Sequence, residues 1–211
     1  FVSPHDCLPL LLEYLIESKG YTGRVVRSVT TGSLLDRVAL AHGLEVEVTP
    51  VGFKYLGSEM LEGNVILAGE ESGGMSIMDH VPEKDGILAC LLASEIVCSR
   101  GKGLAVQLDE LWEMYGRIHV SRTDIKLEGK LREHIGTDYF ESDPSEIAGL
   151  KVDAIDRIDG VKLILDNGDW ILLRLSGTEP LVRIYVQSGS HEKLTSTMEQ
   201  VVSGFYGIMD S

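Results

Sequence analysis

Basic residues are scarce in this sequence of 211 residues. It has 19 lysines and arginines against 33 aspartates and glutamates, so its formal net charge is −14 at pH 7, and both halves of the chain are negative. Nucleic acids and anionic membranes carry charge of the same sign, which makes them poor partners for this chain. A small anionic ligand would need a local concentration of hydrogen-bond donors and positive groups.

Cysteine, long apolar runs and an initial methionine are also scarce or absent. The three cysteines, Cys7, Cys90 and Cys98, are odd in number, and we interpret them as reduced core thiols of a cytoplasmic protein rather than as disulfides or metal ligands. No apolar run reaches the roughly 18 residues that a membrane-spanning helix requires, and no signal segment opens the chain. Because Phe1 begins the chain, we expect a fragment or a processed piece.

The sequence does contain a regular alternation of apolar segments. Hydrophobic residues make up 44% of the chain, enough for a sizeable core. Short β-branched runs alternate with stretches of helical periodicity in the first part of the chain, which predicts a mainly parallel sheet with helices on its faces. We expect helices at 4–19, 33–42 and 53–61, and strands at 24–29, 45–49 and 64–68.

A longer helix over 85–99 is apolar almost all round, which predicts deep burial. A further helix is expected at 107–115. Residues 116–149 are more polar and carry glycine, proline and acidic clusters, so we place the domain boundary at their beginning, with domains at 1–116 and 117–211.

Past residue 150 the pattern changes to strands in series. Asn167-Gly168 is a strong signal for a tight hairpin, and a helix is expected at about 191–208. These features predict a small α+β domain with an antiparallel sheet. The expected strands are 151–158, 161–165, 170–175 and 181–187.

An acidic, glycine-rich loop follows the apolar strand at 64–68. It runs from Gly69 to Gly74 and contains Glu70 and Ser72. Ligands of open α/β sheets collect at the carboxyl ends of strands, and glycines let a backbone turn sharply and approach a ligand closely. A carboxylate and a hydroxyl two residues apart could bind adjacent hydroxyls of a sugar. The alternative is a solvated acidic turn.

Lys84 lies just before the apolar helix over 85–99. A cation near a helix N-terminus is electrostatically unfavourable, which would lower the pKa of the lysine. A lowered pKa suits a lysine that shuttles protons. The alternative is that Lys84 only pairs with Glu83 or Asp85.

A second loop joins the strands at 170–175 and 181–187. It carries Arg174, Ser176, Gly177 and Thr178, and Arg183 follows it. Alternation along the strands directs both arginines away from the core face. Two guanidiniums, two hydroxyls and backbone N–H groups could bind one phosphate dianion, because the guanidinium fork matches phosphate oxygens two at a time. The alternative is a tight turn with surface arginines.

These strings together resemble the α-D-phosphohexomutase superfamily, the phosphoglucomutase/phosphomannomutase group. The resemblance covers nearly the whole chain, and the two loop strings, about 100 residues apart in this order, are highly specific together. It implies the third family domain, an α/β/α sandwich, followed by the fourth, which binds phosphate. The residues that carry it are Val51 to Lys54, Gly69 to Gly74, Glu83 to Gly86, Arg174 to Pro180, and Arg183.

The resemblance implies a reaction in which a phosphoserine exchanges phosphoryl groups with a hexose phosphate through a bisphosphate. Lys84 would then lie near the transferred group, and Lys54 is a weaker candidate contact. The sugar would be bound by Glu70 and Ser72. The phosphate that is not reacting would be bound by Arg174, Ser176, Gly177, Thr178 and Arg183.

The phosphoserine and Mg²⁺ strings of the family are absent from this sequence. The resemblance assigns them to two N-terminal domains, which are expected partners together with the hexose phosphate, and it implies a hexose 1,6-bisphosphate activator. The chain alone is therefore expected to be inactive. Gly74, where some mannose- and glucosamine-type members have histidine, favours a glucose-phosphate type. The alternatives are a non-catalytic phosphosugar-binding module and a plain interaction domain.

Overall fold

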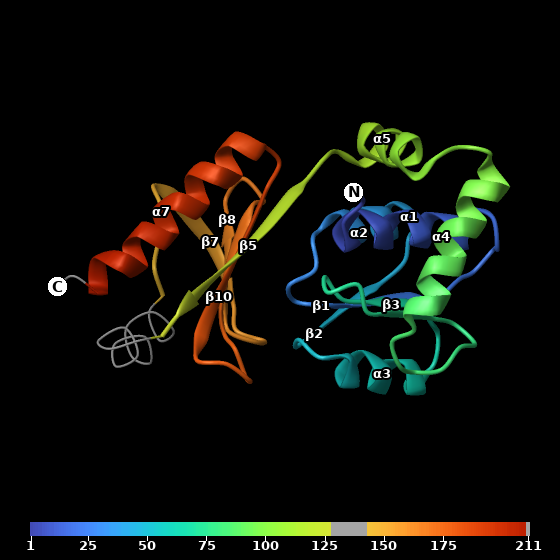
Figure 1. Ribbon diagram of the computed structural model, residues 1–211, viewed down its shortest axis with the longest axis horizontal. Coiled ribbons are helices and arrows are strands. Elements are labelled where there is room, and N and C mark those ends of the chain that lie inside the picture. The colour runs from blue at the N-terminus through green and yellow to red at the C-terminus, as the bar shows by residue number, and fades with distance from the viewer. Residues whose placement is uncertain (128–142, 210–211) are drawn as a thin grey trace. The chain divides into compact units, whose positions relative to one another are not determined.

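The computed structural model describes residues 1–127 and 143–209. The chain divides into two compact units, Phe1–Arg117 and Ile118–Ser211. Each unit is built on its own β-sheet (Figure 1). Among the described residues, no helix combines the length and the apolar character needed to cross a membrane.

The first sheet contains β1 (Arg24–Ser28), β2 (Val46–Thr49), β3 (Val65–Gly69) and β4 (Met75–Ile77), in the order β2-β1-β3-β4. β1 is parallel to both β2 and β3, and the short β4 is antiparallel to β3. β3 is buried along its whole length, as a central strand covered on both faces should be. The predicted mainly parallel sheet is confirmed.

Helices cover both faces of this sheet. Figure 1 shows α1 and α2 on one face and α3 on the other, and α3 packs Phe53 and Leu56 against Val26 and Ala68. The predicted three-layer α/β/α arrangement is therefore present. The helices of this unit are α1 (Pro4–Glu17), α2 (Leu34–Ala41), α3 (Phe53–Glu62), α4 (Gly86–Arg100) and α5 (Leu104–Tyr115).

The predicted deep burial of α4 is wrong. Only Leu92 and Ile96 of this helix are buried, whereas Ile87 is 75% exposed and Leu91 is 64% exposed. One side of α4 packs near α1 and β4, and the opposite side faces outward. A helix that is apolar all round can bury only the sides that find a neighbour within its own unit.

The interpretation of the cysteines as core thiols is also wrong for two of the three. Cys90 and Cys98 lie on α4 and are exposed, and Cys7 on α1 is partly buried. Burial is the main reason that the pKa of the Cys7 thiol is raised. Burial of a cysteine in this chain therefore follows the helix that carries it, and α4 leaves both of its thiols in solvent.

The second unit has a six-stranded antiparallel sheet in the order β5-β10-β9-β8-β7-β6. The hairpin predicted at Asn167-Gly168 joins β8 to β9, with Gly168 at a φ of +83°. The strands are β5 (His119–Lys126), β6 (Glu146–Ile147), β7 (Leu150–Asp156), β8 (Val161–Leu165), β9 (Trp170–Leu175) and β10 (Leu181–Ser188).

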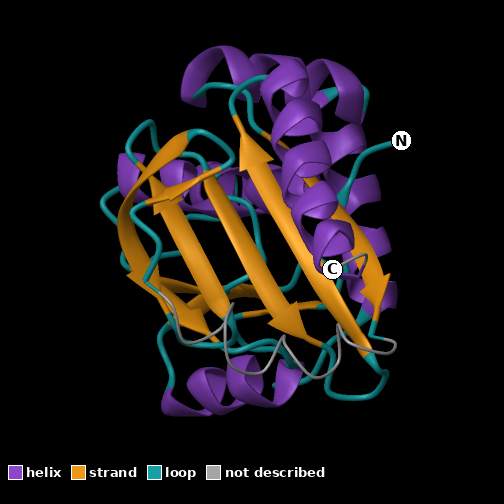
Figure 2. Cartoon of the chain, turned by 90° about the vertical axis from the view of Figure 1, so that its left-hand side faces the viewer, coloured by secondary structure: helices purple, strands orange, loops and turns teal. Residues whose placement is uncertain are grey.

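The helix α7 (His191–Met209) lies across one face of the second sheet (Figure 2). Its apolar side chains, including Leu194 and Phe205, pack on inward-facing residues of the strands. β5 was not predicted, because it lies at an edge of the sheet and only Ile125 along it is buried. The rest of the predicted polar stretch lies largely outside the described residues.

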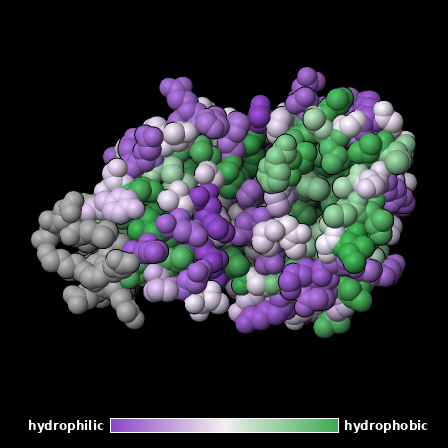
Figure 3. Space-filling view, in the orientation of Figure 1, coloured by the Kyte–Doolittle hydropathy of each residue, from purple (hydrophilic) through white to green (hydrophobic). Residues whose placement is uncertain are grey.

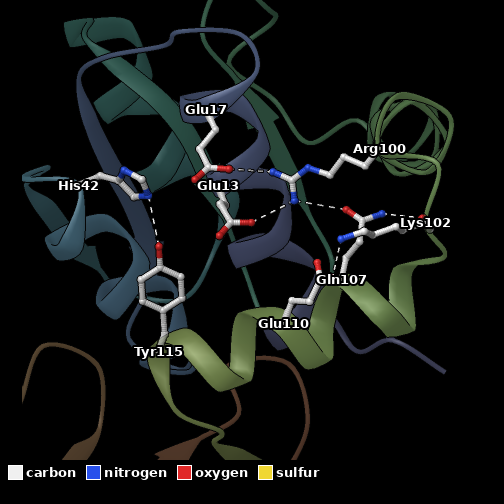
Figure 4. Close-up of polar contacts among 8 residues, drawn as sticks. All are labelled: Glu13, Glu17, His42, Arg100, Lys102, Gln107, Glu110 and Tyr115. Atoms are coloured by element: carbon white, nitrogen blue, oxygen red, sulfur yellow. Dashed lines mark hydrogen bonds and ion pairs between the residues drawn. The ribbon is translucent and has the colours of Figure 1, made fainter.

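A polar network joins α1 to α4 and α5 (Figure 4). The guanidinium of Arg100 donates to Glu13 Oε2 at 3.0 Å, to Glu17 Oε2 at 3.2 Å and to Gln107 Oε1 at 3.3 Å. Glu13 is buried, and this burial raises the pKa of its carboxyl, while the hydrogen bond from Arg100 acts in the opposite direction. The ionised Glu13 is therefore tolerated inside the unit because Arg100 is beside it.

Replacing Arg100 by methionine is expected to destabilise the first unit by about 2–3 kcal/mol at pH 7. The hydrogen bond from Arg100 lowers the pKa of the Glu13 carboxyl, so its removal raises that pKa further. The loss should therefore shrink as the pH falls through the raised pKa of folded Glu13 towards the ordinary value of about 4.3. Urea unfolding at pH 7 and pH 4 measures this. Lys102→Met, which removes an exposed pair with Glu110, is the control and should change stability by less than about 1 kcal/mol. Equal losses at both pH values would contradict the expectation.

Candidate functional site

The acidic loop forms a tight turn between β3 and β4. The backbone N–H of Glu70 donates to the carbonyl of Gly74 at 2.9 Å, and the N–H of Gly73 donates to the carbonyl of Glu70 at 3.0 Å. Gly73 has a φ of +92°, a conformation that favours glycine. Gly69 has no room for a side chain, because a Cβ there would lie 2.6 Å from Leu8 Cδ2. The loop is thus held against the carboxyl end of a buried strand.

Glu70 is turned into this unit, with only 6% of its surface exposed. Its Oε1 accepts a hydrogen bond of 2.9 Å from the backbone N–H of Gly52, at the start of α3. Burial raises the pKa of the Glu70 carboxyl, and the bond from Gly52 opposes that rise. Oε2 lies beside Gly74, so the carboxylate is fixed by one oxygen while the other faces a position without a side chain.

Glu71 points to the other side of the loop and was missed in the sequence. Its Oε2 accepts hydrogen bonds from the hydroxyls of Ser28, at 3.2 Å, and Thr30. Both hydroxyl residues are fully buried at the end of β1. The run of hydroxyl residues directly after an apolar strand was the signal that could have revealed this anchor.

Lys84 lies alongside the loop, because its Cβ and Cδ would be 3.4 Å from a Cβ placed on Gly74. Its ammonium pairs with Glu83 at 2.8 Å, and this hydrogen bond is the main reason that its pKa is raised. The expected lowering of the pKa is therefore wrong, since the adjacent carboxylate outweighs the helix N-terminus. Lys54 is exposed on α3, with its ammonium 4.7 Å from the centre of the Tyr55 ring, and Ser72 is exposed in the loop.

In the second unit, the strand register places Arg174 on β9 directly opposite Arg183 on β10. Both lie on the sheet face away from the core, since the neighbouring Leu173 and Ile184 belong to it. Arg174 Nε donates to Asp159 Oδ2 at 2.7 Å. This bond holds the base of the guanidinium and orients its terminal N–H groups.

Two polar atoms near this loop are buried without a hydrogen-bond partner among the described residues: Ser176 Oγ and Arg183 Nε. Arg183 pairs with Glu179 only through a long contact, 3.5 Å between Nη2 and Oε2. Gly177 and Thr178 are exposed in the same turn. Buried polar groups are normally satisfied, so this loop has unused donor capacity beside two guanidiniums.

The residues predicted for the two sites therefore gather into two separate groups, one in each unit. Glu70, Ser72 and Lys84 are grouped around the loop after β3, and Lys54 projects from α3. The second group is made by Arg174, Ser176, Gly177, Thr178 and Arg183. Within residues 1–127 and 143–209, no group of three or more histidine, cysteine or acidic side chains could hold a metal ion.

Replacing Glu71 by alanine is expected to loosen the acidic loop, because two buried hydroxyls would lose their acceptor. Hydrogen exchange of the Glu70 and Gly73 amides should accelerate about tenfold or more, from a loss of roughly 1.5 kcal/mol. Glu71→Gln keeps an acceptor and should accelerate exchange less. Exchange in Glu71→Ala that equals that of the unchanged chain would contradict this anchoring role.

Both units match models of the same protein family. Residues 3–115 match the phosphoglucomutase/phosphomannomutase alpha/beta/alpha domain III, and residues 131–204 match the C-terminal domain of the same family. A phosphoglucomutase/phosphomannomutase from Thermococcus kodakarensis is 31% identical over 94% of this chain. A phosphoglucosamine mutase from Caldicellulosiruptor bescii is 29% identical, also over 94% of this chain.

A solved structure extends the likeness to three dimensions. The open form of parafusin, a phosphoglucomutase from Paramecium, has a TM-score of 0.73 and 29% identity over the whole chain. The chain spans 41% of the length of the Thermococcus and Caldicellulosiruptor relatives and 42% of the parafusin chain. Together with the matched domains, these likenesses show that the chain belongs to the phosphoglucomutase/phosphomannomutase family, of which it carries domain III and the C-terminal domain.

Proposed function

We propose that this chain is the substrate-binding part of a phosphohexomutase, an isomerase that interconverts hexose 1-phosphate and hexose 6-phosphate through a phosphoserine and a bisphosphate. The observation that carries the proposal is the pair of unpartnered buried atoms, Ser176 Oγ and Arg183 Nε, beside two adjacent arginines. Unsatisfied donors next to paired positive charges favour a bound dianion.

The phosphate would be bound in the second unit. Arg174 is held at Nε by Asp159, which leaves its terminal N–H groups for phosphate oxygens. Arg183 would exchange its long contact with Glu179 for a charge-assisted bond to the ligand. Ser176 Oγ supplies a hydroxyl, and the backbone of Gly177 and Thr178 supplies N–H groups in the exposed turn.

The sugar would be bound in the first unit by Glu70 and Ser72. A buried carboxylate that keeps its charge accepts hydrogen bonds from vicinal hydroxyls strongly, because little water competes with them. Gly52 holds one oxygen of Glu70 in place, so no side-chain rotation is needed on binding. The exposed hydroxyl of Ser72 both donates and accepts, which suits a sugar that binds in two orientations.

Lys84 would act on the transferred phosphoryl group as a cation. The ion pair with Glu83 raises its pKa, so it is protonated at neutral pH and does not serve as a base. A protonated lysine beside the sugar loop would stabilise the charge on a phosphoryl oxygen. Lys54 is a more distant candidate contact.

The remaining parts of the proposed enzyme lie in its preceding domains. We assign the phosphoserine and the Mg²⁺ site to those domains, because this sequence lacks the strings that carry them in the family. A cytoplasmic location and activation by a hexose 1,6-bisphosphate belong to the same proposal.

Two substitutions separate the phosphate loop from the sugar loop. Arg174→Ala should weaken binding of both inorganic phosphate and glucose 1-phosphate by about 10- to 100-fold, from roughly 1.5–3 kcal/mol per charge-assisted bond. Glu70→Ala should weaken the binding of glucose 1-phosphate and leave the binding of inorganic phosphate unchanged. Titration calorimetry on the 211-residue chain measures both ligands, with Lys193→Ala on α7 as a charge-matched control. If both variants bind both ligands like the unchanged chain, the loop assignments are wrong.

Turnover tests the whole proposal. The full-length protein that contains this chain is expected to interconvert the 1- and 6-phosphates of a hexose, assayed with glucose 1-phosphate and mannose 1-phosphate side by side. The 211-residue chain should bind the substrate without converting it, because positioning alone does not supply a nucleophile. Binding without turnover in the full-length protein would favour a phosphosugar-binding module, and measurable turnover by the 211-residue chain would refute the division of roles.

A further inference from the structure

The first turn of α1 packs against the acidic loop after β3. A Cβ placed on Gly73 would lie 3.5 Å from Pro4 Cγ, and a Cβ placed on Gly69 would collide with Leu8. His5 follows Pro4 on this turn and is partly buried. The start of α1 therefore forms part of the support behind the loop.

The imidazole of His5 is bonded to a third segment, the turn between β1 and α2. The backbone N–H of Gly32 in this turn donates to His5 Nδ1 at 3.0 Å, and Gly32 is buried. A backbone N–H can only donate, so Nδ1 must accept and carry no proton. The bond therefore requires the neutral imidazole, with its hydrogen on Nε2.

The same turn holds Glu71 of the acidic loop. The hydroxyl of Thr30, two residues before Gly32, donates to Glu71 Oε2, and Ser28 Oγ donates to the same atom at 3.2 Å. Ser28 Oγ also lies 3.0 Å from Thr31 Oγ1. A displacement of this turn therefore displaces the hydroxyls that fix the loop.

The surroundings of His5 favour its neutral form. In Figure 3, hydrophobic residues gather around the N-terminal end of α1, and an apolar hollow of about 210 Å³ adjoins this turn of the helix. The charged groups that act on His5 are Glu71 from the acidic loop and Asp6 from its own helix, while residues 29–33 carry no titratable side chain. Burial lowers the pKa of the His5 imidazole and outweighs the two carboxylates, which act in the opposite direction.

We propose that His5 is a positioning residue for sugar binding: its neutral imidazole holds the turn after β1, and through that turn it holds the acidic loop. The inference rests on the proposed function, because it assigns the loop to a sugar. Protonation of Nδ1 would set two donors against each other, since the N–H of Gly32 has no acceptor role. The charged imidazole would then attract Glu71 and compete with the hydroxyls of Ser28 and Thr30 that hold it.

His5→Asn separates the hydrogen bond from the titration. The amide oxygen of asparagine occupies nearly the place of Nδ1 and accepts from Gly32, but it does not titrate between pH 5 and 8. Glu70, whose own pKa is raised, titrates in both chains. The quantity that decides is therefore the ratio between the unchanged chain and His5→Asn, measured at each pH.

Hydrogen exchange in the 211-residue chain without ligand tests the positioning step. Above the ordinary histidine pKa, at about pH 7.5, the Gly32 and Glu70 amides should be equally protected in the unchanged chain and in His5→Asn. At about pH 5 the unchanged chain should lose about tenfold more protection than His5→Asn, because only its imidazole becomes charged. His191→Asn, at an exposed position on α7, is the matched control and should follow the unchanged chain.

Ligand titration extends the test to sugar binding. Relative to His5→Asn, the unchanged chain should bind glucose 1-phosphate about tenfold more weakly at about pH 5 and equally well at about pH 7.5. Inorganic phosphate should bind both chains alike at each pH. Protonation of the phosphate group itself affects both chains equally and cancels from the ratio.

A protection ratio that is the same at both pH values would overturn the proposal. A changed protection ratio with an unchanged ratio of glucose 1-phosphate affinities would also overturn it, because His5 would then support the loop without affecting the sugar. A chain that binds neither ligand would contradict the proposed function, while the exchange result would still show whether His5 holds the loop. If His5→Asn does not fold, nuclear magnetic resonance of the unchanged chain decides: the Gly32 amide shift should follow the His5 titration, and a shift that does not follow it would refute the proposal.

Discussion

The opposed anchoring of two consecutive glutamates is the constraint on which the acidic loop after β3 depends. Glu70 accepts from the backbone of Gly52 on one side, and Glu71 accepts from Ser28 and Thr30 on the other. The two carboxylates leave the turn towards different elements, so one loop is tied both to the start of α3 and to the end of β1. Without both ties, a glycine-rich turn would have too many conformations to hold a carboxylate in one place.

The second loop follows the opposite design. In the acidic loop the protein supplies donors to its own carboxylates, whereas the basic loop leaves Ser176 Oγ and Arg183 Nε without partners. A neutral sugar needs an acceptor that is already fixed, because each hydroxyl contributes only a modest net free energy. A phosphate dianion contributes more free energy per hydrogen bond. It can therefore satisfy donors that are costly to leave without a partner. Under the proposed function, the chemistry of the acidic loop suits sugar hydroxyls and that of the basic loop suits a phosphate group.

The sequence was informative where local chemistry and global packing agree. The buried strand β3, the hairpin at Asn167-Gly168 and the facing of Arg174 and Arg183 follow from periodicity and turn chemistry alone. β5 was not predictable, since an edge strand needs only one apolar face and contacts from a distant strand define it. The pairing of Lys84 with Glu83 also outweighed the helix N-terminus, because a contact ion pair is stronger than a partial charge.

The exposure of α4 carries the most general lesson about this chain. Sequence reasoning equated an apolar helix with a buried one, yet Leu92 and Ile96 pack inward while Ile87 and Leu91 face outward. The hydrophobic effect depends only on removing apolar area from water. It is realised only where a neighbour is present, and α1 and β4 reach one side of α4, so an apolar composition alone does not predict that this helix is buried within its own unit.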